Sequence, residues 1–171
     1  EAGFGADLGA EKFLDTKCRV AGIQPDCIVV VATVKALKLH GGADKNNLSE
    51  ENLQALNAGL PNLLKHIENM KKVYSKPTVV AMNRFASDTP AEIEAVISAC
   101  EQAGAPAVFT DVFLKGGEGG KDLAEKVIWM CEKPSQLTYA YDLQDDIKTK
   151  INDIVTRIYG GDGAEFSAEA E

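Results

Sequence analysis

Glycines that could help to hold an anion lie close to the start of the sequence. In segment 3–9, Gly3 and Gly5 flank Phe4, and a helical pattern follows from Ala10. Glycines let backbone amides approach an anion at the start of such a helix. The segment departs by one position from dinucleotide-binding spacing, and the strand that this motif requires is not in the chain. We therefore interpret residues 1–9 as a glycine-rich loop with a weak anion-binding signal.

A second group of candidate residues follows an apolar run in the first half of segment 26–42. The run is β-branched and apolar on both faces, which predicts a central strand of a parallel sheet. The second half contains Lys35, Lys38 and His40 and ends in two glycines. Ligands of open α/β sheets bind just beyond the carboxyl ends of the strands. Segment 35–42 is therefore predicted to form either the rim of a ligand site or a solvated basic loop.

Other patterns that suggest chemistry are incomplete. Segment 116–121 resembles a phosphate-binding loop, but Lys115 stands at the first required glycine and Asp122 at the magnesium-binding hydroxyl. His40 and His66 lack partners at metal-ligand spacing, so we expect no metal site, although His40 could contact a ligand from its strand exit. No nucleophile with a neighbouring base can be assembled from the sequence.

The elements that would position these residues alternate between strands and helices. Further apolar runs predict strands at 78–83 and 106–112, with exits at 83–88 and 113–120. Right-handed crossovers between parallel strands would bring all three strand exits to one edge of the sheet. The predicted fold class is therefore α/β, with a mainly parallel open sheet and helices on both faces, as in Rossmann-like or flavodoxin-like three-layer domains.

The helices are predicted from their caps and their apolar stripes. They are expected from Ala10 toward Gly22, after an N-cap at Ser49, after a capping box at Thr89, over 121–132, and after an N-cap at Asp142. Pro61 is expected to kink or divide the second of these helices. The last helix is expected to bury Leu143, Ile147, Ile151, Ile154, Val155 and Ile158.

Length and charge limit the possible classes of function. At 171 residues we expect a single domain over 1–171, ending in an acidic tail over 162–171. A net charge of -8 argues against nucleic acid as a partner, and no apolar run is long enough to span a membrane. Four widely separated cysteines predict reduced thiols in a cytoplasmic protein, with Cys27 buried in the central strand and unbridged. A start without methionine suggests a piece of a longer protein.

Two long blocks of the sequence resemble one enzyme family. Segment 31–42 (VATVKALKLHGG) is similar to a signature of formate–tetrahydrofolate ligases, and segment 1–13 (EAGFGADLGAEKF) resembles another block of that family. Segments 83–89 and 115–120 follow in the expected order, so the resemblance covers essentially the whole chain. It implies an ATP-dependent ligase that uses magnesium and makes 10-formyltetrahydrofolate from formate and tetrahydrofolate through formyl phosphate.

The resemblance also implies what this piece contributes. It is similar to the second α/β domain of a longer, homo-oligomeric parent, whose phosphate loop lies upstream and whose remaining domains are its partners. The family's folate clamp maps onto Phe85 and Phe113, although Phe113 stands where tryptophan is usual and Ala86 replaces a frequent proline. Both phenylalanines would come from one sheet edge, as a two-sided clamp requires. The alternative is that both pack under their loops as part of the core.

Other residues gain expected roles from the same resemblance. Gly116 and Gly117 would let the backbone approach the ligand, while Lys12, Lys35 and Lys38 could provide positive charge toward phosphate or the folate carboxylates. We expect the piece alone to be inactive. The alternatives are an independent small-molecule-binding module and a purely structural α/β domain.

Overall fold

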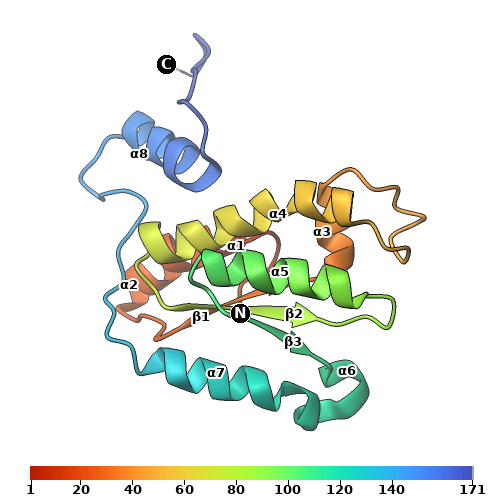
Figure 1. Cartoon of the computed structure of the whole chain (residues 1–171). Helices are drawn as coiled ribbons and strands as arrows, with labels where there is room; N and C mark the ends of the chain where they lie inside the picture. Colours follow the sequence, from red (N-terminus) through yellow and green to blue (C-terminus); the bar gives the residue numbers. More distant parts are fainter. Residues whose placement is uncertain (171) are drawn as a thin grey trace.

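Three parallel strands form the centre of the computed structural model, which describes residues 1–170. The strands are β1 (Ile28–Ala32), β2 (Thr78–Asn83) and β3 (Ala107–Thr110), in the spatial order β1-β2-β3. Ile28 lies opposite Thr78, and Val80 lies opposite Ala107. Helices cover both faces of this sheet (Figure 1). The predicted α/β class, with a mainly parallel open sheet between helical layers, is confirmed.

One face of the sheet carries the helices that precede β1 or connect the strands. They comprise a continuous helical segment made of α1 (Gly9–Glu11), the π-helix η1 (Lys12–Cys18) and α2 (Arg19–Ala21), then α3 (Val34–His40), α4 (Leu53–Glu68) with the π-helix η2 (Asn69–Val73), and α5 (Pro90–Gln102). Leucine and isoleucine side chains of α4 pack with Val30 and Val80 of the sheet and with Leu14 of η1 in one core cluster. The helix α7 (Lys121–Cys131) lies on the opposite face (Figure 1).

The remaining elements follow β3. The short helix α6 (Val112–Lys115) and the 3₁₀ helix η3 (Gly116–Gly120) lead into α7. After an irregular segment, α8 (Ile147–Asp153) continues into the π-helix η4 (Ile154–Tyr159). Figure 1 shows α8 beyond one end of α4, away from the sheet.

The strand predicted to be central lies at an edge of the sheet. β2 is the middle strand, and all of its residues except Asn83 are buried. In β1, by contrast, Val29 and Val31 are 39% and 63% exposed, because α7 packs on β2 and β3 and leaves this part of the sheet uncovered. Cys27 precedes β1 and is only partly buried, so its expected burial in a central strand was wrong, although it is free, as predicted.

Several helix boundaries also differ from the prediction. The segment 35–42 is largely the helix α3, with Thr33 as N-cap, rather than a loop. The cap of α4 is Asn52 instead of Ser49, and α4 continues through Pro61 without dividing. β3 ends at Thr110, because the chain turns at Asp111 into α6.

The last helix also differs from its prediction. Its N-cap is Asp146, whose side chain accepts a hydrogen bond from the Thr149 amide, rather than Asp142. Of the predicted stripe only Ile158 is fully buried, while Leu143 and Ile147 are 57% and 76% exposed. These side chains are exposed because α8 extends beyond the sheet, where no neighbouring element among residues 1–170 covers them (Figure 1).

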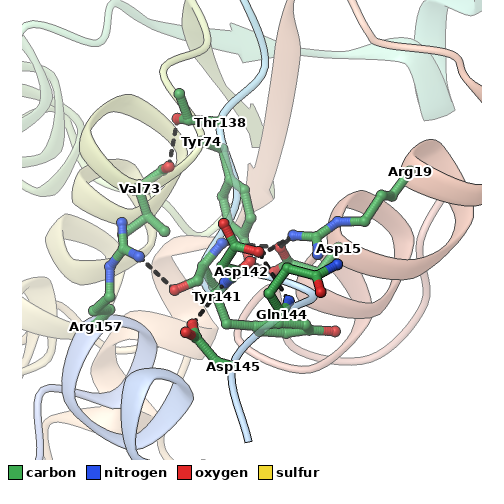
Figure 2. A network of polar contacts seen from close by, with 11 residues as sticks. Asp15, Arg19, Val73, Tyr74, Thr138, Tyr141, Asp142, Gln144, Asp145 and Arg157 are labelled. Atoms are coloured by element: carbon green, nitrogen blue, oxygen red, sulfur yellow. Dashed lines mark hydrogen bonds and ion pairs between the residues drawn. The ribbon is translucent and has the colours of Figure 1, made fainter. Parts of the chain in front are cut away.

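A buried polar network attaches the segment before α8 to the rest of the domain (Figure 2). Asp15 of η1 accepts hydrogen bonds from the Tyr74 hydroxyl at 2.8 Å and from the Ala140 amide at 2.9 Å. Arg19 donates to the Tyr141 carbonyl at 2.8 Å, and Arg157 of η4 donates to the Ala140 carbonyl. The network therefore connects η1, η4 and the end of η2 through one stretch of irregular chain.

The helices α3 and α4 cross with their backbones in contact. A Cβ atom at Gly41 would lie 1.8 Å from the Ala55 carbonyl oxygen, and one at Gly59 would lie 1.9 Å from that of Leu37. Neither position can accept a side chain unless the helices separate. Two glycines therefore fix the position of α3 at the exit of β1.

Candidate functional site

The three strand exits meet at the carboxyl edge of the sheet. Thr33 follows β1, Arg84 follows β2 and Asp111 follows β3. The exits of β2 and β3 are joined, since the Arg84 amide donates to the Thr110 carbonyl at 3.0 Å. The Thr110 hydroxyl also donates to Asn83 Oδ1 at 3.1 Å. These contacts hold the two predicted aromatic residues on neighbouring exits.

Phe85 lies on a closed turn after β2. Its amide donates to Asp88 Oδ2 at 2.9 Å, and the Asp88 amide donates to the Phe85 carbonyl at 3.0 Å. The Phe85 ring is 42% exposed, and Lys35 Nζ lies 4.5 Å from its centroid. Asp88 itself is buried, and burial raises the pKa of its carboxyl group. The turn therefore presents an aromatic face with a cation beside it.

Lys38 is committed to a buried ion pair with Glu92 of α5. Lys38 Nζ lies 2.8 Å from Glu92 Oε1, and it also donates to the Glu50 carbonyl at 2.8 Å. Both side chains are fully buried. Burial raises the pKa of Glu92, but hydrogen bonds from Lys38 and from the amides of Asn52 and Thr89 outweigh it, so the pKa is lowered. This lysine joins α3 to α5 and faces no open site.

Phe113 lies after β3 on the helix α6, where a loop was predicted. Its ring is 98% exposed, and Gly116 follows with a positive φ of 56°. The Asp111 amide donates to the Gly119 carbonyl at 3.1 Å, and a Cβ at Gly119 would lie 2.4 Å from the Asp111 carbonyl carbon. The segment 116–120 is thus a 3₁₀ helix folded tightly against the end of β3. A Cβ at Gly117, in contrast, would meet no atom within 4 Å.

The glycine-rich loop at the start of the chain forms a compact turn. The Gly5 carbonyl accepts hydrogen bonds from the Leu8 and Gly9 amides at 3.1 and 2.8 Å. A Cβ at Gly9 would lie 1.8 Å from the Gly3 carbonyl oxygen. Phe4 has a positive φ of 64° and is 94% exposed, and Lys12, in the following helix, is also exposed.

His40 lies at a groove beside β1, together with part of this loop. The groove has a volume of about 670 Å³, and Phe4, Gly5 and His66 are among the residues that line it. His40 Nδ1 lies 2.7 Å from Asn62 Nδ2. Burial lowers the pKa of His66. Phe85 and Phe113 do not line this groove. The predicted residues therefore fall into two groups, one at the groove with His40 and one at the strand exits, where Lys35 contacts Phe85.

Some important residues were not identified from the sequence. Glu92, the partner of Lys38, was predicted only as part of a capping box. The Asn83–Thr110 contact joins two strand ends and has no sequence signal of its own. Among residues 1–170, no group of His, Cys, Asp and Glu side chains has the arrangement of a metal site. No helix within the same residues is long and apolar enough to cross a bilayer.

Comparisons with known proteins show to which family this chain belongs. A family model described as formate–tetrahydrofolate ligase matches residues 1–171. The chain is 53% identical over 170 residues to a formate–tetrahydrofolate ligase of Symbiobacterium thermophilum, an alignment that covers 99% of this chain. It spans about a third of that relative, 31% of its length. On the match over its whole length, the chain belongs to the formate–tetrahydrofolate ligase family.

Proposed function

We propose that the parent protein is an ATP-dependent ligase that joins formate to tetrahydrofolate. The reaction proceeds through formyl phosphate and gives 10-formyltetrahydrofolate. The observation that carries this proposal is the match of the ligase family model over residues 1–171. The 53% identity to a relative of the same name supports it.

We assign to this chain the binding of the folate ring system. Phe85 and Phe113 come from the exits of neighbouring parallel strands, and both rings are accessible. A flat ring between them would gain about 0.5–1.5 kcal/mol from stacking on each, beyond the area buried. Gly116 and Gly117 leave space around the backbone next to Phe113. Lys35, beside Phe85, is the cation best placed to meet a folate carboxylate.

We assign the binding of the ATP phosphates and of magnesium to another part of the enzyme. A phosphate cradle requires backbone amides that point freely into a loop. In segment 116–120 the chain is a 3₁₀ helix, Gly119 is packed against Asp111, and Lys121 pairs with Glu118 at 2.6 Å. These residues do not fit a phosphate group. We therefore derive no step of phosphoryl transfer from them.

The purified chain should not form 10-formyltetrahydrofolate when it is supplied with formate, ATP, magnesium and tetrahydrofolate. The expectation follows because segment 116–120, the part of the chain that resembles a phosphate loop, does not form a phosphate cradle. Turnover by the chain that is abolished by substitutions within it would show that the active site has been assigned to the wrong part of the enzyme.

The folate assignment can be tested in the intact enzyme. Phe85→Ala should raise the KM for tetrahydrofolate by about two- to tenfold, because the lost stacking energy corresponds to this change in affinity. It should leave the KM for ATP unchanged. Phe113→Trp should retain or improve folate affinity, because it enlarges the stacking face. The matched control is Trp129→Ala, which removes a half-exposed ring near the C-terminal end of α7, away from Phe113. Unchanged folate kinetics in Phe85→Ala would refute the clamp.

A further inference from the structure

One edge of the sheet is open along β1. The Ile28 amide donates to the Pro77 carbonyl at 2.9 Å, so the polar backbone groups of Ile28, Val30 and Ala32 face β2. Those of Val29 and Val31 point the opposite way, where no strand lies among residues 1–170. An unpaired strand edge presents donors and acceptors that another strand can satisfy.

The groove of about 670 Å³ follows this open edge. Its lining includes Leu14 of η1 and Ala36 of α3 on the helical side, and Val29 and Val31 on the other face of the sheet. The groove therefore gives access to both faces of the sheet beside β1. That shape suits an extended strand, whose side chains alternate between the two faces.

The handedness of the chain indicates which segment belongs there. From β1 through α4 to β2, and from β2 through α5 to β3, the strands advance in one direction while the helices lie on one face (Figure 1). The segment made of α1, η1 and α2 lies on that same face and leads into β1. Because such crossovers are right-handed, a strand that precedes this segment must lie beside β1, on the side away from β2.

The start of the chain lies in the right place for this connection. The helical segment runs from α1 to α2 toward the amino end of β1 (Figure 1), so Glu1, Ala2 and Phe4, which line the groove, lie toward the carboxyl end of β1. A chain that enters from this end must have run parallel to β1 before it turned into the glycine-rich loop. The chain spans 31% of the length of its relative, so the intact enzyme has further segments that could pair with this edge.

We propose that the residues directly before Glu1 in the intact enzyme form a strand parallel to β1 that fills this groove. The side of the groove near the helices is lined by apolar residues such as Ala10, Leu14 and Ala36, and the other side by valines. The strand should therefore be a run of about five apolar, largely β-branched residues, buried on both faces. The open edge is then an internal seam of a larger sheet. This inference does not depend on the ligase reaction.

Hydrogen exchange of the β1 amides in the intact enzyme tests the proposal. The amides of Val29 and Val31 should be protected to within about tenfold of those of Val30 and Ala32. In the 171-residue chain alone they should exchange at least about a hundredfold faster than Val30. If Val29 and Val31 exchange as fast in the intact enzyme as in the 171-residue chain, the proposal is overturned.

Variants identify the occupant of the edge. Two prolines placed in the residues directly before Glu1 should remove the protection of Val29 and Val31 and leave that of β2 unchanged. Protection that persists in this variant would mean that another segment, or a second copy of the chain, covers the edge, and it would overturn the proposal. Val31→Lys should reduce the protection of Val29 at least about tenfold. Val20→Lys, at an 85% exposed valine of α2, should leave it unchanged.

Discussion

Replacing Lys38 by methionine removes the charge that balances Glu92 within the domain. At 2.8 Å and an effective dielectric constant of about 20, the attraction between the two charges is about 6 kcal/mol, most of which offsets their desolvation. Without Lys38, the Glu92 carboxylate stays fully buried with only two backbone amides as partners. Removing one member of such a pair costs about 3–5 kcal/mol. Lys38→Met should therefore lower the free energy of unfolding by about this amount.

The assay is urea denaturation of the 171-residue chain followed by circular dichroism at neutral pH. Lys38→Met combined with Glu92→Gln should recover more than half of the loss, since no charge then remains buried. Lys72→Met is the matched control, because Lys72 forms an exposed pair with Glu68, and it should change the free energy of unfolding by less than about 1 kcal/mol.

The pH dependence gives a second measurement. The folded pKa of Glu92 lies below its ordinary value near 4.5, so its contribution is complete above that pH and is lost as the pH falls through the lower value. In Lys38→Met, burial is no longer outweighed by the lysine, so the folded pKa should rise and the deficit should shrink on acidification. This account would be refuted if Lys38→Met lowered the free energy of unfolding by less than about 1 kcal/mol, or if the decrease did not depend on pH.

Three further predictions concern Tyr74, Gly119 and Cys27. Tyr74→Phe removes the hydroxyl that donates to Asp15 at 2.8 Å, and it should cost about 1.5–3 kcal/mol in urea denaturation because the acceptor is charged. Gly119→Ala should cost about 1–3 kcal/mol in thermal denaturation, since its Cβ would overlap the Asp111 carbonyl. Burial raises the pKa of Cys27 to about 11, so its alkylation by iodoacetamide should be slow at pH 8 and accelerate about tenfold per pH unit up to pH 10.

Each of these predictions has a comparison within the chain. Tyr159→Phe, at a half-exposed ring, should lower the free energy of unfolding by less than about 1 kcal/mol. If Tyr74→Phe costs no more than this, the stabilising role of the Tyr74–Asp15 hydrogen bond is contradicted. Gly117→Ala should be tolerated because its Cβ meets no atom within 4 Å, so equal effects at both glycines would refute the packing argument. Cys100, which is fully buried, is the reference for Cys27 and should react more slowly at every pH because its thiol is inaccessible. A Cys27 rate that does not change with pH would contradict its raised pKa.

Local signals in the sequence were sufficient for part of the fold. The capping box of Thr89 and Glu92 was predicted and is present, since both hydrogen bonds depend on residues three apart. The strand at 78–83 has the predicted bounds. A β-branched run does not reveal which neighbours will cover it, so β1 was predicted to be central although it lies at an edge of the sheet formed within residues 1–170. The exposure of Val29 and Val31 depends on where α7 packs, about a hundred residues later.

The candidate site was predicted less completely. Phe85 and Phe113 were predicted to lie at the same edge of the sheet because both follow parallel strands, and strand direction can be predicted well from the sequence. The burial of Lys38 does not, because it depends on a carboxylate 54 residues away. The spacing of Val34 and Leu37, both buried in α3, was a helical signal that continues into segment 35–42, which was predicted as a ligand-site rim or a solvated loop. At the other end of the chain, Asp142 was predicted as the cap of the last helix, but segment 142–146 is irregular and Asp146 is the cap.

The glycine contact between α3 and α4 has a consequence for ligand affinity. A helix of seven residues such as α3 would not persist on its own, yet here it is held by Gly41, Gly59 and a buried ion pair. A contact between two backbones cannot rearrange through changes of side-chain rotamer, so α3 has few alternative positions. Lys35 therefore projects from a rigid base toward Phe85. A ligand at this edge would lose little conformational entropy in the protein, since the ordering that usually weakens binding has already occurred during folding.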